Sequence, residues 1–323
     1  MPSSRKAEVA LLGATGAIGG TLSSALSARG TPYRVVGRDE AKLRAEFGAD
    51  PLAEIVTWNP DDPASIRTAL SGVSAAVHMV GVPYDRFALH PVLMKRVVDA
   101  AVVERVDRVL LIGTLYVFGR ARAPRITEDH PRDPHTYKGR KRKEQEDILM
   151  TAPLKAAILR LPDFYGPGVA SSLLHDVFVA AAQDRRANVI GPVDVPHEFV
   201  FVPDVGPVAA RMLETPDAFG RAWNLAGVGT ISEREIAALA FAPRKPRLRV
   251  ANKLMLRLLG LFNPLMRELV EMNYLMTDPL IVDDAALTGL IGPIAKTSYV
   301  DGVARCVEAA KASLQQPGKK PAA

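Results

Sequence analysis

The feature that most restricts how this chain can fold is the octapeptide GATGAIGG at residues 13–20, directly behind the apolar run 9–12. Glycines in a strand-to-helix turn permit backbone angles closed to other residues, let a ligand approach, and let helix and strand pack closely. The amides at the start of such a helix form an anion site that the helix dipole strengthens. Glycine turns also serve purely structural ends, but the position directly after the first predicted strand favours a loop that binds a diphosphate.

Apolar, β-branched runs recur along the first half of the chain, with stretches of helical character between most of them. The runs are EVALL, YRVVG, EIVTW, AAVHMV, RVLLIG and AAILRL. We predict helices at 17–29, 63–70, 91–103 and 137–150. Such alternation indicates a parallel sheet with helices on both faces. The predicted fold class is therefore α/β, a doubly wound parallel sheet (Rossmann fold) with a smaller, mainly helical substrate lobe.

The pattern changes after about residue 165, where helical and loop-rich segments begin, and HEFVFVPDV and AWNLAG then resemble a return to the sheet. The domain assignment is 1–165 and 196–226 for the dinucleotide-binding domain, 166–195 and 227–311 for the substrate lobe, and 312–323 for a flexible tail. Ser232 and Glu235 fit a capping box, which predicts a helix from about Glu233. The Leu, Met and Phe side chains between 254 and 276 are expected to pack the lobe and line part of its site.

Composition narrows the class of protein. Of the 323 residues, 48% are hydrophobic and 24% charged, a globular balance. The net charge of +6 comes from 41 basic and 35 acidic residues spread along the chain, so nucleic-acid binding is disfavoured. The single cysteine, Cys306, excludes an internal disulfide, and no leader pattern precedes the first strand. We expect a cytoplasmic protein without a membrane span or a metal; the most apolar segment, 254–266, is interrupted by Arg257, Gly260, Asn263 and Pro264.

The end of the second predicted strand, RVVGRDE, bears on which dinucleotide binds. Proteins that bind NAD commonly hold the adenosine ribose with a carboxylate there, whereas this chain has Gly37 and then Arg38. A guanidinium pairs with a phosphate through two hydrogen bonds. We therefore expect NADP, with Arg38 on the 2′-phosphate and Arg34 as a second positive group. The alternative is that Arg38 is a surface arginine and Asp39 binds the ribose of NAD.

Tyr137 and Lys141 are four residues apart in TYKGRKRKEQEDIL, so on a helix they share one face. A nearby ammonium stabilises a phenolate and lowers the pKa of the phenol from about 10, which would make the pair usable for acid–base chemistry. Gly139 between them costs about 1 kcal/mol in a helix and predicts close approach of another element. The alternative is a charged helix face in solvent.

Several motifs in order make the chain resemble the extended short-chain dehydrogenase/reductase family of NAD(P)-dependent epimerases, dehydratases and carbonyl reductases. They are GATGAIG (13–19), LLIGTLYVFG (110–119), the Tyr137/Lys141 pair, LRLPDFYGPG (159–168), HEFVFVPDV and WNLAG. The resemblance implies that Thr114 hydrogen-bonds the reacting oxygen, that Tyr137 exchanges its proton, and that Lys141 holds the nicotinamide ribose and lowers the Tyr137 pKa. Hydride then passes between nicotinamide and the carbon bearing that oxygen.

The resemblance also implies which residues contact the dinucleotide. Asn59 stands where the family often has an aspartate that accepts from adenine, and an amide oxygen can still accept. The turn after the fourth strand, at Met79, would form the cofactor wall. The expected contacts are Gly13, Thr15, Gly16, Ala17, Ile18, Gly19, Arg38, Asn59, Pro60, Met79, Val80, Gly81, Tyr137, Lys141 and Leu161.

Departures from the family pattern indicate the reaction. Related dehydratases carry Asp-Glu after the catalytic threonine, where this chain has Leu115 and Tyr116, so dehydration by that route is disfavoured. Related nucleotide-sugar epimerases have an asparagine and an arginine where this chain has Asp163 and His197. A carboxylate there would repel a diphosphate. The expected substrate is therefore an uncharged, partly apolar carbonyl or alcohol compound, and Tyr84, Tyr116 and Asp163 are the candidates to contact it.

The sequence therefore predicts an NADP-dependent oxidoreductase, with NAD as the alternative cofactor, that acts on a carbonyl or alcohol through Thr114, Tyr137 and Lys141. One alternative is an NAD(P)-dependent sugar epimerase, which regenerates its cofactor each turnover. Another is a regulator that senses dinucleotide without catalysis. His90, at the start of the fourth predicted helix, is expected to be a surface residue rather than a proton relay. The resemblance further implies a homodimer through helices 91–103 and 137–150.

Overall fold

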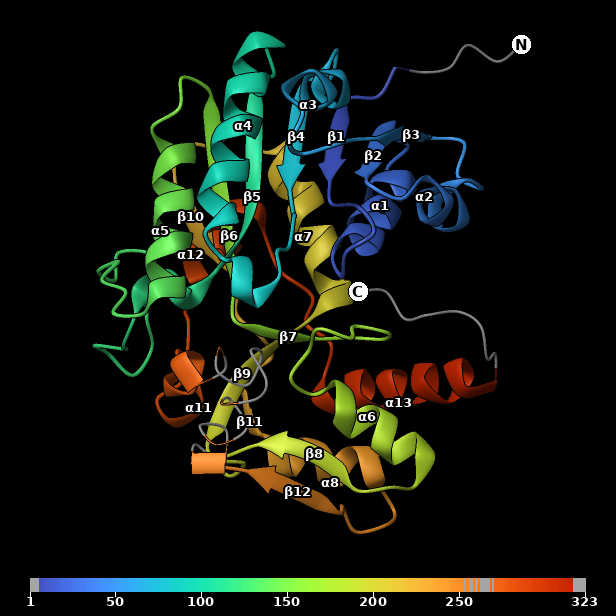
Figure 1. Ribbon diagram of the computed structural model, residues 1–323, viewed down its shortest axis with the longest axis vertical. Helices are drawn as coiled ribbons and strands as arrows, with labels where there is room; N and C mark the ends of the chain where they lie inside the picture. Colours follow the sequence, from blue (N-terminus) through green and yellow to red (C-terminus); the bar gives the residue numbers. More distant parts are fainter. Residues whose placement is uncertain are drawn as a thin grey trace.

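The computed structural model describes residues 6–252, 254, 255, 258, 261, 268 and 270–315. Its centre is a sheet of seven parallel strands in the order β10-β6-β5-β4-β1-β2-β3 (Figure 1). Their bounds are β1 (Val9–Leu12), β2 (Tyr33–Gly37), β3 (Ala53–Thr57), β4 (Ala75–His78), β5 (Arg108–Thr114), β6 (Lys155–Leu161) and β10 (Ala222–Asn224). The chain order reverses between β1 and β4, and ligands bind at such a switch point in open α/β sheets.

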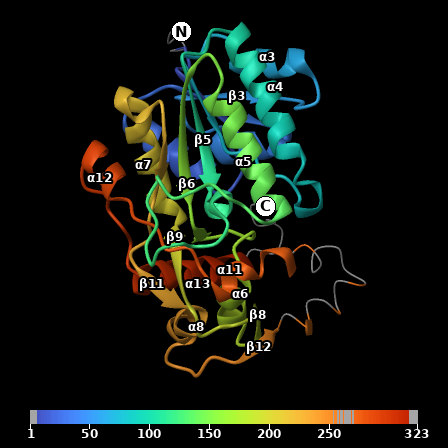
Figure 2. The ribbon, with the colours of Figure 1, turned by 90° about the vertical axis from the view of Figure 1, so that its left-hand side faces the viewer.

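Alternating side chains of the central strands fill two cores, one on each face of the sheet. In β1, Val9 and Leu11 join one core and Ala10 and Leu12 the other. The first core is covered by α1 (Gly19–Ala28), α2 (Glu40–Phe47), α7 (Val202–Glu214) and α12 (Ala285–Ile291); the second by α3 (Pro63–Leu70), α4 (Leu89–Val103) and α5 (Tyr137–Met150). Figure 2 shows β5 and β6 between α7 and α12 on one side and α4 and α5 on the other. The predicted doubly wound sheet is confirmed.

A second, smaller lobe lies below the carboxyl ends of these strands in Figure 1. It has a three-stranded sheet in the order β11-β9-β7 and a strand pair, β12-β8. Its strands are β7 (Asp163–Tyr165), β8 (Ala187–Ile190), β9 (Pro196–Phe201), β11 (Thr230–Ser232) and β12 (Leu248–Ala251), and its helices include α6 (His175–Gln183), α8 (Glu233–Phe241), α11 (Tyr274–Thr277) and α13 (Tyr299–Gln315). A third core, from α6, α8, α13 and these strands, holds the lobe together.

The structure corrects part of the sequence prediction for the lobe. The strand in HEFVFVPDV is β9, which pairs with β7 and β11 rather than returning to the large sheet; only AWNLAG, as β10, returns. Residues 312–315 continue α13 instead of starting the tail, and 316–323 lie outside the described residues, as does most of 254–266.

Helices 63–70 and 137–150 and the capping box of Ser232 with Glu235 are confirmed. Among the described residues, no helix has the length and apolarity to cross a membrane.

Candidate functional site

The glycine loop between β1 and α1 has the geometry of a phosphate-binding turn. Gly13 has φ +87°, a conformation that glycine adopts readily, and a Cβ on Gly19 would lie 1.8 Å from the Ala14 carbonyl oxygen. The loop therefore cannot form with larger residues at these two positions. Helix α1 starts after Ile18 without a side-chain cap, so its first amides are available to an anion. A diphosphate fits this site.

The turn after β4 packs directly on this loop. A Cβ on Gly13 would lie 3.1 Å from the Val80 Cα and 3.2 Å from the Met79 carbonyl. The turn after β4 and the glycine loop therefore form one continuous surface. Lys42 Nζ donates to the Thr15 carbonyl oxygen at 3.3 Å, which adds a cation beside the loop. The structure thus brings together the predicted contacts Gly13, Thr15, Gly16, Ala17, Ile18, Gly19, Met79, Val80 and Gly81.

The residues at the end of β2 are those that bear on the choice between NADP and NAD. Arg38 is exposed there, whereas the Asp39 carboxylate accepts from the Lys42 amide at 3.0 Å and caps α2. Asp39 thus has a structural partner at the start of α2, and Arg38 is exposed beside it. Arg34 does not add positive charge beside Arg38, because it is buried, pairs with Glu54 and points toward the end of α3.

The predicted adenine contact is altered by a local turn. Asn59 Oδ1 accepts from the Asp61 amide at 3.0 Å, and the Asn59 amide donates to Ser65 Oγ at 2.8 Å. The side-chain oxygen of Asn59, which was expected to accept a hydrogen bond from adenine, thus already accepts one from the Asp61 amide. Pro60 also has a structural partner, because its carbonyl oxygen accepts from Arg96 at 2.8 Å.

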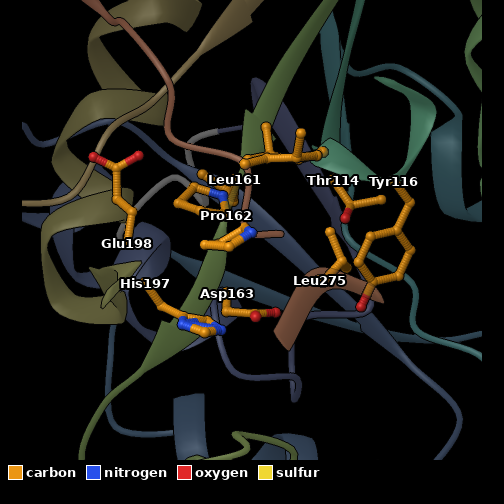
Figure 3. A pocket seen from close by; sticks show the side chains of 11 residues that line it. Thr114, Tyr116, Leu161, Pro162, Asp163, His197, Glu198 and Leu275 are labelled. Atoms are coloured by element: carbon orange, nitrogen blue, oxygen red, sulfur yellow. The ribbon is translucent and has the colours of Figure 1, made fainter. Parts of the chain in front are cut away.

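A small pocket lies where β5, β6 and the second lobe meet (Figure 3). Thr114 ends β5 beside Leu161, its register partner at the end of β6. The pocket has a cavity volume of about 20 Å³, room for roughly one water molecule and far below the roughly 300–1,000 Å³ of ligand pockets. Its lining is Thr114, Leu115, Tyr116, Leu161, Pro162, Asp163, His197, Glu198, Leu275, Pro279 and Leu280. The sequence thus placed Thr114, Leu161, Tyr116 and Asp163 at a common site.

Tyr137 and Lys141 lie on the outer face of α5, not in this pocket. Tyr137 is 45% exposed. Lys141 Nζ lies 5.9 Å from the centre of the Tyr137 ring and donates to Glu144 on the surface at 2.7 Å. The two side chains share a helix face, as predicted, but the prediction that this face meets the reacting atoms is wrong. The reason is the position of Gly139, whose Cβ would lie 2.6 Å from the Tyr116 carbonyl oxygen, so this side of the helix faces the site.

The inward face of α5 instead carries Lys138 and Arg142, one position further along with the same spacing. Lys138 is fully buried and donates to Glu271 at 2.8 Å and to Glu268, and its ammonium lies 5.6 Å from the Tyr84 ring centre. Arg142 donates to the Ile112 carbonyl oxygen at 3.2 Å. Sequence reasoning missed both because every side chain from 140 to 147 is polar, and no apolar stripe marks the buried face.

Burial sets the protonation of the groups around this face. Tyr84 and Tyr116 share a hydrogen bond of 3.1 Å between their hydroxyl oxygens, and burial raises the pKa of both phenols. Lys138 and Arg142 act in the opposite sense on the pKa of Tyr84, but less strongly. Both tyrosines are therefore neutral hydrogen donors at physiological pH.

His90 is buried, contrary to the expectation of a surface residue, and its Nδ1 lies 3.0 Å from Arg142 Nη1. Since arginine only donates, Nδ1 accepts and the proton sits on Nε2. Burial and the Arg142 charge lower the pKa of His90 to about 2 and that of His78 to about 3, and burial lowers the pKa of Arg142 to about 10. Arg142 is thus the charged member of this trio.

Three buried carboxyl groups lie in or beside the pocket. Burial raises the pKa of Asp163 to about 6 and, despite a hydrogen bond from the Val282 amide, the pKa of Glu198 to about 7. Glu233, at the start of α8, is 2% exposed, and burial with the nearby Asp163 charge raises its pKa to about 8. His197 stays neutral because burial lowers its pKa to about 4. Sequence reasoning missed Glu198, although it lies in HEFVFVPDV, and Glu233, which follows the helix cap Ser232, because their burial depends on the tertiary structure.

Comparisons with known proteins agree with this architecture. A model of the NAD dependent epimerase/dehydratase family matches residues 9–226. Protein YeeZ of Escherichia coli K12 is 27% identical over 274 residues, which cover 82% of this chain and 88% of that protein. UDP-glucuronic acid 4-epimerase from Bacillus cereus, in complex with NAD, superposes with a TM-score of 0.76 at 14% identity, covering 94% of this chain and 99% of that one. WbmH of Bordetella bronchiseptica with NAD+ gives 0.75 at 21%, covering 97% and 100%. At these identities the two structures establish the fold alone.

The buried Glu233 predicts a pH-dependent stability. Because its pKa is raised from 4.5 to about 8, the folded state loses stability as pH rises through that interval, while the unfolded chain ionises freely. Glu233→Gln removes this penalty. The variant should gain stability over the wild type between about pH 5 and pH 8, by up to a few kcal/mol since each pKa unit is worth about 1.4 kcal/mol. Urea unfolding at both pH values measures it.

The exposed Glu144 is the matched control for this experiment, because it lies on the surface of α5. Glu144→Gln should show no such pH dependence. A constant difference between Glu233→Gln and the wild type across the pH range would contradict the assignment.

Proposed function

Because the chain belongs to the NAD dependent epimerase/dehydratase family, we propose that it reduces a small carbonyl compound with NADPH. The observation that carries the proposal is that Thr114 and Tyr116 line one pocket at the carboxyl end of β5. The glycine loop follows β1 at the same edge of the parallel sheet. Bound NADPH supplies hydride to the carbonyl carbon. The Thr114 and Tyr116 hydroxyls hydrogen-bond the carbonyl oxygen and stabilise the charge that develops on it.

Tyr116 then supplies the proton to that oxygen, and its hydrogen bond to Tyr84 extends the relay by one group. An alkoxide is far more basic than a phenolate, so even a phenol with a raised pKa can protonate it. The Lys138 ammonium over the Tyr84 ring and the Arg142 guanidinium stabilise negative charge on the tyrosine pair. The pairing of a cation with a phenol that was expected for Tyr137 and Lys141 is thus assigned to other residues. The cations, Lys138 and Arg142, belong to the same helix, whereas the phenols, Tyr84 and Tyr116, come from two other segments.

The raised pKa values also bear on the direction of the reaction. Oxidation of an alcohol needs a base at the same place, and a phenol whose pKa is raised by burial is a poor base at neutral pH. Epimerisation needs an oxidation and a reduction in each turnover. The arrangement therefore favours net reduction over epimerisation. The buried Asp163 in the pocket also opposes the UDP-sugars named for related structures, because its carboxylate would repel a diphosphate.

A second function, dinucleotide sensing without catalysis, is favoured by one observation: the Tyr137/Lys141 pair lies outside the pocket. The two functions differ in a simple assay. A reductase consumes NADPH when a panel of small ketones and aldehydes is added. A sensor binds NADPH with no consumption for any of them.

We also propose a homodimer in the cytoplasm. Helices α4 and α5 pack against each other as an outer layer, and Val92 and Tyr137 on them are exposed, which suits the pairing that the resemblance implies. The single cysteine is consistent with a reducing compartment.

For the cofactor, Arg38→Ala should weaken NADPH binding by about tenfold or more and leave NADH binding nearly unchanged, because hydrogen bonds to charged groups contribute about 1.5–3 kcal/mol. Fluorescence titration of both dinucleotides measures the effect. Arg44→Ala is the matched control, since Arg44 lies on α2 and pairs with Glu40 on the surface. Equal losses for NADPH and NADH would exclude selection of the 2′-phosphate by Arg38.

For catalysis, Tyr116→Phe should lower kcat for NADPH-dependent carbonyl reduction by roughly 10²–10⁴-fold, the usual contribution of a general acid. Tyr137→Phe should leave kcat within about twofold, because that phenol lies on the outer face of α5, and less than 0.5 kcal/mol is worth about twofold. NADPH affinity, measured in parallel, shows that the cofactor site is intact. The opposite ranking of the two variants would restore the original assignment of Tyr137.

A further inference from the structure

The pocket at Thr114 and Tyr116 is closed in this structure. Its cavity volume of about 20 Å³ holds roughly one water molecule, so even a small ketone does not fit. The proposed function places the carbonyl oxygen of the substrate at these two hydroxyl groups. One wall of the pocket must therefore move before a substrate can reach them.

One part of the lining is held by neither sheet of the molecule. Thr114 and Leu161 end adjacent strands of the large sheet, and the lining residues of β7 and β9 belong to the three-stranded sheet. The remaining wall comes from residues 271–280, here called the cover segment, whose regular structure is limited to single helical turns such as α11. The cover segment contributes Leu275, Pro279 and Leu280 to the pocket.

The cover segment is held at its two ends by different interactions. The chain that follows it is fixed by backbone pairing, since the Ile126 amide donates to the Ile281 carbonyl oxygen and the Asp283 amide donates to the Ile126 carbonyl oxygen, both at 2.8 Å. Its first residue, Glu271, is held by side-chain contacts alone. One carboxylate oxygen accepts from the Lys138 amide at 3.2 Å and the other from the Lys138 ammonium at 2.8 Å. Both contacts lie in the first turn of α5, where the helix dipole favours an anion.

The ion pair is strong enough to hold the cover segment and open enough to break. The Lys138 ammonium is fully buried and donates to Glu268 and Glu271, whose side chains are 28% and 26% exposed. A buried charge that loses its partners is costly, so the pair favours the closed state. Water already reaches both carboxylates, and it can solvate the groups once the cover segment lifts.

The closed cover segment also carries an unfavourable contact. The Tyr274 ring packs edge-on against His135, with 4.5 Å between the ring centres, and the side chain is buried. Its hydroxyl group has no hydrogen-bond partner among the described residues. Buried polar groups are normally paired, so the closed state bears a penalty that exposure to water would remove.

We propose that residues 271–280 form a movable cover over the pocket, that the ion pair of Lys138 with Glu268 and Glu271 is its latch, and that release of the latch admits the substrate. The inference rests on the proposed function for the use of this pocket as the substrate site. Lys138 lies on a helix of the large sheet, whereas the two glutamates belong to the second lobe. The latch can therefore open locally while both sheets stay folded.

Hydrogen exchange of the full-length protein, followed by mass spectrometry, measures the opening. In the double variant Glu268→Gln/Glu271→Gln, glutamine still offers an acceptor to the Lys138 amide, but the buried ammonium loses both carboxylates. Peptides covering 272–280 should then exchange about tenfold or more faster than in the wild type. The control Glu144→Gln removes a surface carboxylate that pairs with Lys141 on the same helix, and it should leave the exchange unchanged.

The single cysteine distinguishes local opening from unfolding of the lobe. Cys306 is 2% exposed in the third core, so its reaction with iodoacetamide reports unfolding there. The double variant should react at Cys306 as slowly as the wild type. Equal acceleration of Cys306 and of residues 272–280 would overturn the proposal, because the glutamates would then stabilise the lobe as a whole.

A second thiol shows whether the opening exposes the pocket. Leu115 lines the pocket, is 4% exposed and shares a small core with Leu280 of the cover segment. In Leu115→Cys the new thiol should react with iodoacetamide about tenfold or more faster once the two glutamine substitutions are added. Unchanged exchange of 272–280, or an unchanged rate at this thiol, would refute the latch.

The proposed reduction fails separately from the cover. Protein that opens as described but consumes no NADPH with any ketone or aldehyde would refute the reductase and support the cover. Consumption of NADPH by a protein in which the double variant changes neither exchange nor thiol reaction would do the reverse.

Discussion

The close contact between Gly139 and the Tyr116 carbonyl oxygen is the constraint on which the site depends. A Cβ at this position would lie 2.6 Å from that oxygen, and 2.7 Å from the Pro134 side chain, so α5 can approach the turn after β5 only with glycine there. Once the contact forms, the helix cannot rotate, and each neighbouring residue is committed to one face. Lys138 and Arg142 turn toward the site, and Tyr137 and Lys141 turn toward solvent.

This orientation buries charge, and the structure compensates for it with specific partners. Glu146, one turn beyond Arg142, is 1% exposed and binds Arg160 of β6 at 2.8 Å and 3.0 Å. Lys138 is held by Glu268 and Glu271. A buried charge without a partner would cost several kcal/mol, so these pairs fix the helix against the sheet more by the penalty of breaking them than by their net attraction. Lys138 and Arg142 lower the pKa of Tyr84, but burial outweighs them and the phenol stays protonated.

Much of the fold follows from the sequence because its patterns are local. The glycine turn, the two helices predicted to the residue and the Ser232 capping box depend on neighbours along the chain. The orientation of α5 does not. A helix turns 100° per residue, so a shift of one position exchanges one face for another, and YKGRKRKEQEDILM has no apolar stripe to decide between them. Gly139 is the informative residue, but its partner, the Tyr116 carbonyl oxygen, is known only from the tertiary structure. The pairing of β9 with β7 and β11 also joins segments that are distant in the sequence. The position of Glu198 on β9 therefore does not follow from local patterns either.

The most direct test of this account is the reactivity of two lysines in the folded protein, with no substitution made. Acetylation by an amine-reactive reagent, followed over time by peptide mass spectrometry, reports Lys138 and Lys141 separately. The account predicts that Lys141 reacts readily, since it lies on the surface of α5, and that Lys138 is protected until the protein is unfolded. Rapid reaction of Lys138 together with protection of Lys141 would contradict it, because it would place the Tyr137/Lys141 face toward the cleft.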